Sequence, residues 1–223
     1  MTAAGVLAAE SPLAVYAVAL RRAAAGARSE LTAVDTRERV RAYQPGAWCG
    51  DLRDGDAELL ARCAGPTLDV GCGPGRLAGT LAARGRPALG IDVSPEAVRL
   101  ARRRGVRALR RDVLGRLPDE GCWQRVLLVD GSVGIHGDPA RLLRRCRELA
   151  APEGEILVEL DPPGARSWAG QIRIRVAGGA LSAPFPWAYL GADDLGWLAG
   201  AAGVRVRERW TEAGRWFASL AQD

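Results

Sequence analysis

The fold is decided by one short stretch, Asp69-Val70-Gly71-Cys72-Gly73-Pro74-Gly75. A run of buried-strand character, Thr67 to Val70, leads into it, and a helical pattern begins directly after Gly75. A glycine-rich turn between a strand and a helix lets backbone amides approach a ligand without intervening side chains. The stretch therefore predicts a ligand site where the first strand of an α/β sheet ends.

The same strand-and-helix unit repeats along the chain after this turn. Five strand-like runs, TLDVG, PALGID, RALRRD, RVLLVDG and EILVELD, place aspartates at or near their ends, which are Asp69, Asp92, Asp112, Asp130 and Asp161. Helical stretches separate most of these runs, an alternation that is typical of parallel strands joined by crossover helices. We therefore predict an α/β fold with a Rossmann-like, doubly wound, mostly parallel sheet. In such sheets ligands bind outside the carboxyl ends of the strands.

The flanks of this region predict further elements. Residues 1–55 are expected to form a helical N-terminal cap, with one helix from Pro12 and a second from about Thr32 to Tyr43. After Asp161 the rhythm breaks, and residues 162–190 predict a lid insertion containing a hairpin. The remaining residues predict a helix followed by a terminal antiparallel strand pair.

Composition narrows the class of protein. The chain has 223 residues and a formal net charge of +5, and all 31 basic residues are arginine. The exclusive use of arginine indicates a GC-rich genome, so the charge is weak support for a nucleic-acid partner. The five cysteines, Cys49, Cys63, Cys72, Cys122 and Cys146, form no CxxC pair, and the single histidine leaves no metal motif. We expect a cytoplasmic protein with no membrane segment.

The glycine turn has a distinctive spacing. Its glycines follow the pattern GxGxG, Arg76 occupies the position of the third dinucleotide-type glycine, and Asp69 precedes the first glycine by two. With Asp92, Asp112-Val113 and Asp130-Gly131 at successive strand ends, residues 60–161 resemble the class I S-adenosylmethionine-dependent methyltransferases of the short bacterial small-molecule type.

This resemblance implies a cofactor, S-adenosyl-L-methionine, a product, S-adenosyl-L-homocysteine, and a catalytic domain over residues 56–223. It also implies a role for each strand-end residue. Asp92 would accept hydrogen bonds from the ribose hydroxyls, and Val93 and Asp112 would contact adenine. The backbone at Asp130 would contact the methionine ammonium, and Asp69 would orient the loop. The full set of expected cofactor-binding residues is Asp69, Gly71, Cys72, Gly73, Gly75, Asp92, Val93, Asp112, Val113, Asp130 and Gly131.

Two further features have competing interpretations. His136 follows the fourth strand, where the resemblance places the methyl acceptor, and imidazole titrates near neutral pH. It is either a catalytic general base or an ordinary loop residue. The aromatic cluster of the insertion, Trp168, Phe185, Trp187 and Tyr189, either walls an acceptor pocket or packs the hairpin.

Three alternative functions stay open at this point. A nicotinamide-dependent dehydrogenase shares the glycine turn and the later acid, although Arg76 and Asp69 argue against it. A nucleic-acid methyltransferase is suggested by Asp161-Pro162-Pro163, but Gly164 replaces the aromatic residue needed to stack on a flipped base. The third is a scaffold that binds the cofactor without transferring a methyl group.

We predict methyl transfer to a small-molecule acceptor, a secondary metabolite of a biosynthetic route. The protein is expected to be a monomer or homodimer without a nucleic-acid or membrane partner.

Overall fold

A seven-stranded sheet forms the centre of the molecule in the computed structural model, which describes residues 9–222. The strands are β3 (Thr67–Val70), β4 (Ala88–Asp92), β5 (Ala108–Arg110), β6 (Trp123–Leu128), β7 (Ala150–Leu160), β10 (Val204–Glu212) and β11 (Arg215–Gln222). Their order is β10-β11-β7-β6-β3-β4-β5, and the five strands from β7 to β5 are parallel. The predicted mostly parallel sheet with a terminal antiparallel pair is confirmed.

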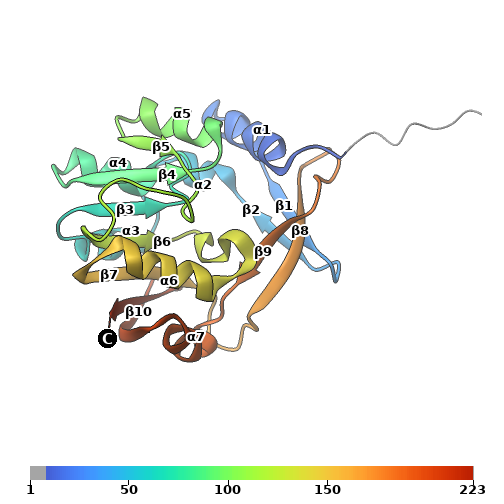
Figure 1. Ribbon diagram of the computed structural model, residues 1–223. Helices are drawn as coiled ribbons and strands as arrows, with labels where there is room; N and C mark the ends of the chain where they lie inside the picture. The colour runs from blue at the N-terminus through green and yellow to red at the C-terminus, as the bar shows by residue number, and fades with distance from the viewer. Residues whose placement is uncertain (1–8, 223) are drawn as a thin grey trace, which may run out of the picture.

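Helices cover both faces of this sheet (Figure 1). They are α3 (Asp56–Ala61), α4 (Arg76–Ala83), α5 (Pro95–Arg103), α6 (Pro139–Leu149) and α7 (Leu195–Ala202). Consecutive residues of a strand point to opposite faces, so Val126 and Leu128 enter one core while Leu127 enters the other. Burial on both faces explains why the strands read as continuous apolar runs.

Capping side chains fix where two of these helices begin. The Ser94 hydroxyl accepts a hydrogen bond from the Ala97 amide at 3.3 Å, and the Asp138 carboxylate accepts from the Arg141 amide at 2.9 Å. Each cap is followed by a proline in the first turn, whose missing N–H costs nothing there. These helices therefore begin immediately after the strand ends that carry the expected ligand site.

A second sheet stands beside the first, at the right of Figure 1. It contains β1 (Leu31–Asp35), β2 (Val40–Tyr43), β8 (Trp168–Val176) and β9 (Phe185–Tyr189), in the order β2-β1-β8-β9 with every pair antiparallel. The predicted hairpin of the insertion is the β8 and β9 pair. Helix α1 (Pro12–Ala24) packs against this sheet through Val15 and Ala19.

The predicted helix from about Thr32 to Tyr43 is wrong, since this segment forms β1 and β2. A local turn and pairing with a strand far along the chain favour two strands over a helix. The Asp35 carboxylate accepts from the Arg37 amide at 2.7 Å and the Arg39 amide at 3.0 Å, which closes a tight turn between the strands. Strand β8, far along the chain, then pairs with the whole of β1.

The expectation of a wholly helical cap over residues 1–55 is corrected accordingly. Its residues 1–8 lie outside the described part of the chain. In the remainder, α1 and the short helix α2 (Pro45–Cys49) flank the two strands. The N-terminal segment and the insertion, predicted as two separate additions, are joined in one antiparallel sheet.

Candidate active site

The three glycines of the turn all adopt left-handed backbone conformations. The φ angles of Gly71, Gly73 and Gly75 are +68°, +53° and +82°. Residues with a side chain rarely adopt such angles, so the turn requires glycine. A Cβ added to Gly73 would meet only the Tyr16 hydroxyl, at 3.5 Å. The backbone at Gly73 is thus open towards the cavity that α1 covers.

The other two glycines permit close packing of neighbouring elements. A Cβ on Gly71 would lie 3.2 Å from the Cβ of Ser132, in the turn η1 (Ser132–Gly137). A Cβ on Gly75 would lie 2.9 Å from the side chains of Ala101 and Val106. Gly75 therefore allows α4 to approach α5, and its place is in the packing beneath the turn.

A cavity of about 570 Å³ lies above the carboxyl ends of the parallel strands, within the roughly 300–1,000 Å³ common for small-molecule sites. Ten of the residues expected from the sequence line it: Asp69, Gly71, Cys72, Gly73, Asp92, Val93, Asp112, Val113, Asp130 and His136. The two expected residues that do not line it are Gly75, described above, and Gly131, which borders a smaller neighbouring cavity.

Asp92 is held against the glycine turn. Its carboxylate accepts a hydrogen bond from the Gly73 amide at 3.0 Å and from the Ser94 amide at 2.7 Å. The side chain is 8% exposed, and burial raises the pKa of Asp92 from 3.8 to about 6. Two backbone amides thus orient a carboxylate in the cavity, while each oxygen keeps a lone pair for a ligand.

Asp69 lies deeper than Asp92. It is 4% exposed, and burial raises its pKa from 3.8 to about 7, with a smaller contribution from the neighbouring carboxylate of Asp130. Its carboxylate accepts a hydrogen bond from the Ala78 amide in the first turn of α4, which lowers the pKa and favours the charged form. Asp69 therefore connects the end of β3 to the helix that follows the turn.

Asp112 and His136 are in direct contact. Oδ1 of Asp112 lies 2.8 Å from Nε2 of His136 and also accepts the Leu114 amide at 2.9 Å. His136 has a φ of +63°, which is uncommon for a residue other than glycine and is often associated with functional sites. In residues 9–222, Oδ2 of Asp112 has no hydrogen-bond partner, so it is available to a ligand while Oδ1 holds the imidazole.

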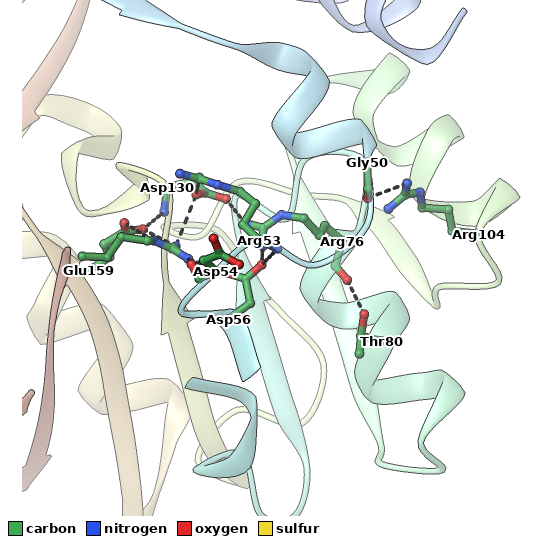
Figure 2. Close-up of polar contacts among 10 residues, drawn as sticks. Gly50, Arg53, Asp54, Asp56, Arg76, Thr80, Arg104, Asp130 and Glu159 are labelled. Carbon is green, nitrogen blue, oxygen red and sulfur yellow. Dashed lines mark hydrogen bonds and ion pairs between the residues drawn. The ribbon is translucent and has the colours of Figure 1, made fainter. Parts of the chain in front are cut away.

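Asp130 lies in a network of ion pairs (Figure 2). Its carboxylate contacts Arg76 and lies 2.7 Å from Arg53 and 3.6 Å from Arg215. Its amide donates to Glu159 at 2.7 Å. The carboxylate is thus already neutralised by the protein, which leaves the backbone around it as the ligand-facing part.

A second carboxylate completes this network. Asp56 has no exposed surface, and it contacts Arg76 and lies 2.7 Å from Arg215. Three arginines therefore balance the carboxylates of Asp56, Asp130 and Glu159. Removal of one member would leave a buried charge unpaired. The network could not be predicted because nothing in the sequence distinguishes these arginines from the other basic residues.

Tyr16 is a further residue that the sequence did not single out. It projects from α1 into the cavity beside Gly73, and burial raises the pKa of its hydroxyl well above 10.0, with help from Asp92. The phenol therefore stays protonated and can act as a hydrogen-bond donor. The position of Tyr16 in the cavity is seen only in the folded structure, where α1 lies beside the glycine turn.

Some members of the aromatic cluster of the insertion line a cavity, and others pack the hairpin. Phe185 and Trp187 line the main cavity. Tyr189 borders the smaller cavity of about 210 Å³, and Trp168 stacks on Tyr189 with a centroid distance of 5.8 Å. Two members of the cluster are thus pocket walls, and Trp168 packs the hairpin.

A comparison with protein families indicates which reaction this site could support. Residues 67–154 match a family model described as a methyltransferase domain. This range contains the glycine turn, every expected cofactor-binding residue and His136. Residues 67–154 are therefore similar in sequence to a methyltransferase domain. The fold of the whole chain is similar to that of solved S-adenosylmethionine-dependent methyltransferases.

Solved structures with this fold include a methyltransferase from Bacteroides fragilis in complex with S-adenosyl-L-homocysteine. It is 21% identical, with a TM-score of 0.76, and the match covers 97% of each chain. The amino pentose methyltransferase CalS10 of Micromonospora echinaspora is 20% identical with a TM-score of 0.56, over 75% of this chain and 90% of that one.

A third similar structure is the 1,6-didemethyltoxoflavin-N1-methyltransferase of Burkholderia thailandensis. It is 20% identical with a TM-score of 0.53, over 75% of this chain and 76% of that one. A search of curated protein sequences found no match. Among residues 9–222, no helix has the length and apolar character needed to span a bilayer.

Proposed function

We propose that this chain binds S-adenosyl-L-methionine and transfers its methyl group to a small-molecule acceptor, a secondary metabolite. The observation that carries the proposal is the meeting of the glycine turn with the carboxylates of Asp69, Asp92, Asp112 and Asp130 in one cavity. The methyltransferase family match over residues 67–154 supports the same chemistry.

The residues present fit the cofactor. The open backbone at Gly73 leaves room for a ligand to approach the turn. Asp92, oriented by two amides, would accept from the ribose hydroxyls, and Val93 at 42% exposure would lie against adenine. The free Oδ2 of Asp112 would accept from the adenine amine. The backbone beside Asp130 would meet the methionine ammonium.

When bound, the cofactor supplies an activated sulfonium methyl group. The protein's contribution is then mainly to hold the acceptor in line with it and to exclude water. His136, oriented by Asp112 at 2.8 Å, would take the proton that the acceptor loses. Tyr16 would close the cavity above the glycine turn from α1.

The small-molecule class rests on the neighbours. The structure from Burkholderia thailandensis holds 1,6-didemethyltoxoflavin, and CalS10 is an amino pentose methyltransferase of calicheamicin biosynthesis. The same cavity extends from the expected cofactor contacts to Phe185 and Trp187, where an acceptor of this kind would lie. Cytoplasmic location and a monomeric or homodimeric state stay predictions from the sequence.

The test is calorimetric titration with S-adenosyl-L-homocysteine and, in parallel, with oxidised nicotinamide dinucleotide. We expect binding of the first and none of the second. Preference for the dinucleotide would overturn the proposal in favour of a dehydrogenase.

A further inference from the structure

The cavity has two chemically different walls. One is the methyltransferase domain, and every Asp, Arg and His side chain that lines the cavity within the described residues comes from positions 69–136. The other is the second sheet with α1. Its contribution consists of carbon surface and uncharged groups, mainly Leu31, Ala33, Ile172, Ile174, Phe185 and Trp187.

Strand geometry maintains this separation. Alternate residues of β8 point to opposite faces of the sheet, so Ile172 and Ile174 are buried against the cavity and α1. Arg173 and Arg175, the residues between and after them, are exposed on the far face. Ala33 of β1 pairs with Ile174 and is the smallest side chain on this wall. The second sheet thus carries charge, but none of it faces the cavity from these strands.

The expected cofactor contacts all lie on the charged wall. A cofactor bound there leaves the second sheet as the surface against which the acceptor must rest. An acceptor with a charged group on that side would lose its hydration without gaining a partner of opposite charge, which is strongly unfavourable. An apolar acceptor surface gains from the same burial.

We propose that the methyl acceptor is an uncharged, mainly apolar molecule that packs against the second sheet, with Ala33 and Ile174 setting the depth of its pocket. This inference rests on the proposed function and specifies its substrate class. The acceptor's polar atom, which receives the methyl group, points towards the methyltransferase domain.

Three probes that share one ring system test the charge preference: 2-naphthol, 2-naphthoate and 2-naphthylmethylammonium. Each is titrated calorimetrically into the protein saturated with S-adenosyl-L-homocysteine. We expect 2-naphthol to bind at least tenfold more tightly than either ion. If an ion binds as tightly as 2-naphthol, or if 2-naphthol does not bind to the saturated protein, the proposal is overturned.

Failure of the proposed function gives a different result, because S-adenosyl-L-homocysteine itself would then not bind. Two variants test whether the naphthalene probes bind at the second sheet. Ile174→Arg supplies a cation to this wall and should reverse the preference, so that 2-naphthoate binds better than 2-naphthol. Arg173→Ala, one residue away on the opposite face, is the matched control and should behave as the wild type.

Ala33→Leu provides an independent variant should Ile174→Arg not fold. The added side chain fills the pocket, so 2-naphthol should bind at least tenfold more weakly while S-adenosyl-L-homocysteine binds unchanged. Undiminished binding of 2-naphthol to Ala33→Leu would place the probe elsewhere and overturn the proposal.

Discussion

Asp92 allows a quantitative test of the cofactor site. Its carboxylate accepts from the amides of Gly73 and Ser94 at 3.0 and 2.7 Å, and we propose that it also accepts from the ribose hydroxyls. Asp92→Ala removes a charged acceptor, and losing hydrogen bonds to a charged group costs about 1.5–3 kcal/mol. The affinity for S-adenosyl-L-homocysteine should therefore fall by roughly 10- to 150-fold.

The pH dependence of S-adenosyl-L-homocysteine binding gives a second quantitative prediction for Asp92. Burial raises the pKa of Asp92 from 3.8 to about 6, so in the empty protein its ionised fraction is about 0.9 at pH 7 and about 0.1 at pH 5. If the ribose needs the ionised carboxylate, the wild type should lose roughly tenfold in affinity between these two pH values. Asp92→Ala should lose clearly less.

The assay is calorimetric titration with S-adenosyl-L-homocysteine at several pH values between 5 and 8. Asp194→Ala is the matched control, since it removes the same charge from an exposed position whose side chain makes no capping bond. Unchanged affinity and an unchanged pH profile in Asp92→Ala, relative to this control, would refute the ribose assignment.

Three other predictions concern the same cavity. Gly73→Val places a branched side chain at a φ of +53° and into the ligand space, so cofactor binding should vanish in calorimetry while circular dichroism keeps its native form. Burial raises the folded-state pKa of Asp69 from 3.8 to about 7, so the folded protein holds this proton more tightly than the unfolded chain does. The resulting contribution to the free energy of unfolding is fully present below about pH 4 and is lost as the pH rises through 7. Denaturant unfolding of Asp69→Asn should therefore show a flatter decline in stability from pH 5 to 8 than the wild type, and an equally steep decline would contradict the assignment. His136→Ala should lower the methyl-transfer rate by roughly 10²–10⁴ with cofactor binding intact, whereas a smaller loss with an unchanged pH–rate profile would make His136 a positioning residue or a bystander.

The central sheet was predictable because its signals are local. Each parallel strand, its terminal aspartate and the following turn lie within a few residues of one another, and Ser94 and Asp138 cap their helices as a linear pattern suggests. The ends of parallel strands share one edge, so the meeting of Asp69, Asp92 and Asp112 in one cavity follows from topology.

The second sheet was not predictable in the same way. The segment from Thr32 to Tyr43 contains no glycine or proline to interrupt it, and its apolar residues also fit a helical spacing. Its strands are stabilised by pairing with β8, whose position relative to β1 depends on the complete fold. Local sequence therefore carries no signal for this partner.

The ion pairs around Asp130 illustrate a further difficulty. Arg53 and Arg215 lie far apart in the sequence, and both contact the same carboxylate. In a sequence whose 31 basic residues are all arginine, no pattern separates the buried ones from those on the surface. Only the tertiary structure identifies them.

The most direct test of methyl transfer uses S-adenosylmethionine with an isotopically labelled methyl group, incubated with the protein and fractionated metabolite extract from the source organism. We expect label to appear in one low-mass, mainly apolar compound, and we expect Asp92→Ala to abolish or greatly slow its appearance. Tight binding of S-adenosyl-L-homocysteine with no labelled product in any fraction, or label confined to nucleic acid, would contradict it.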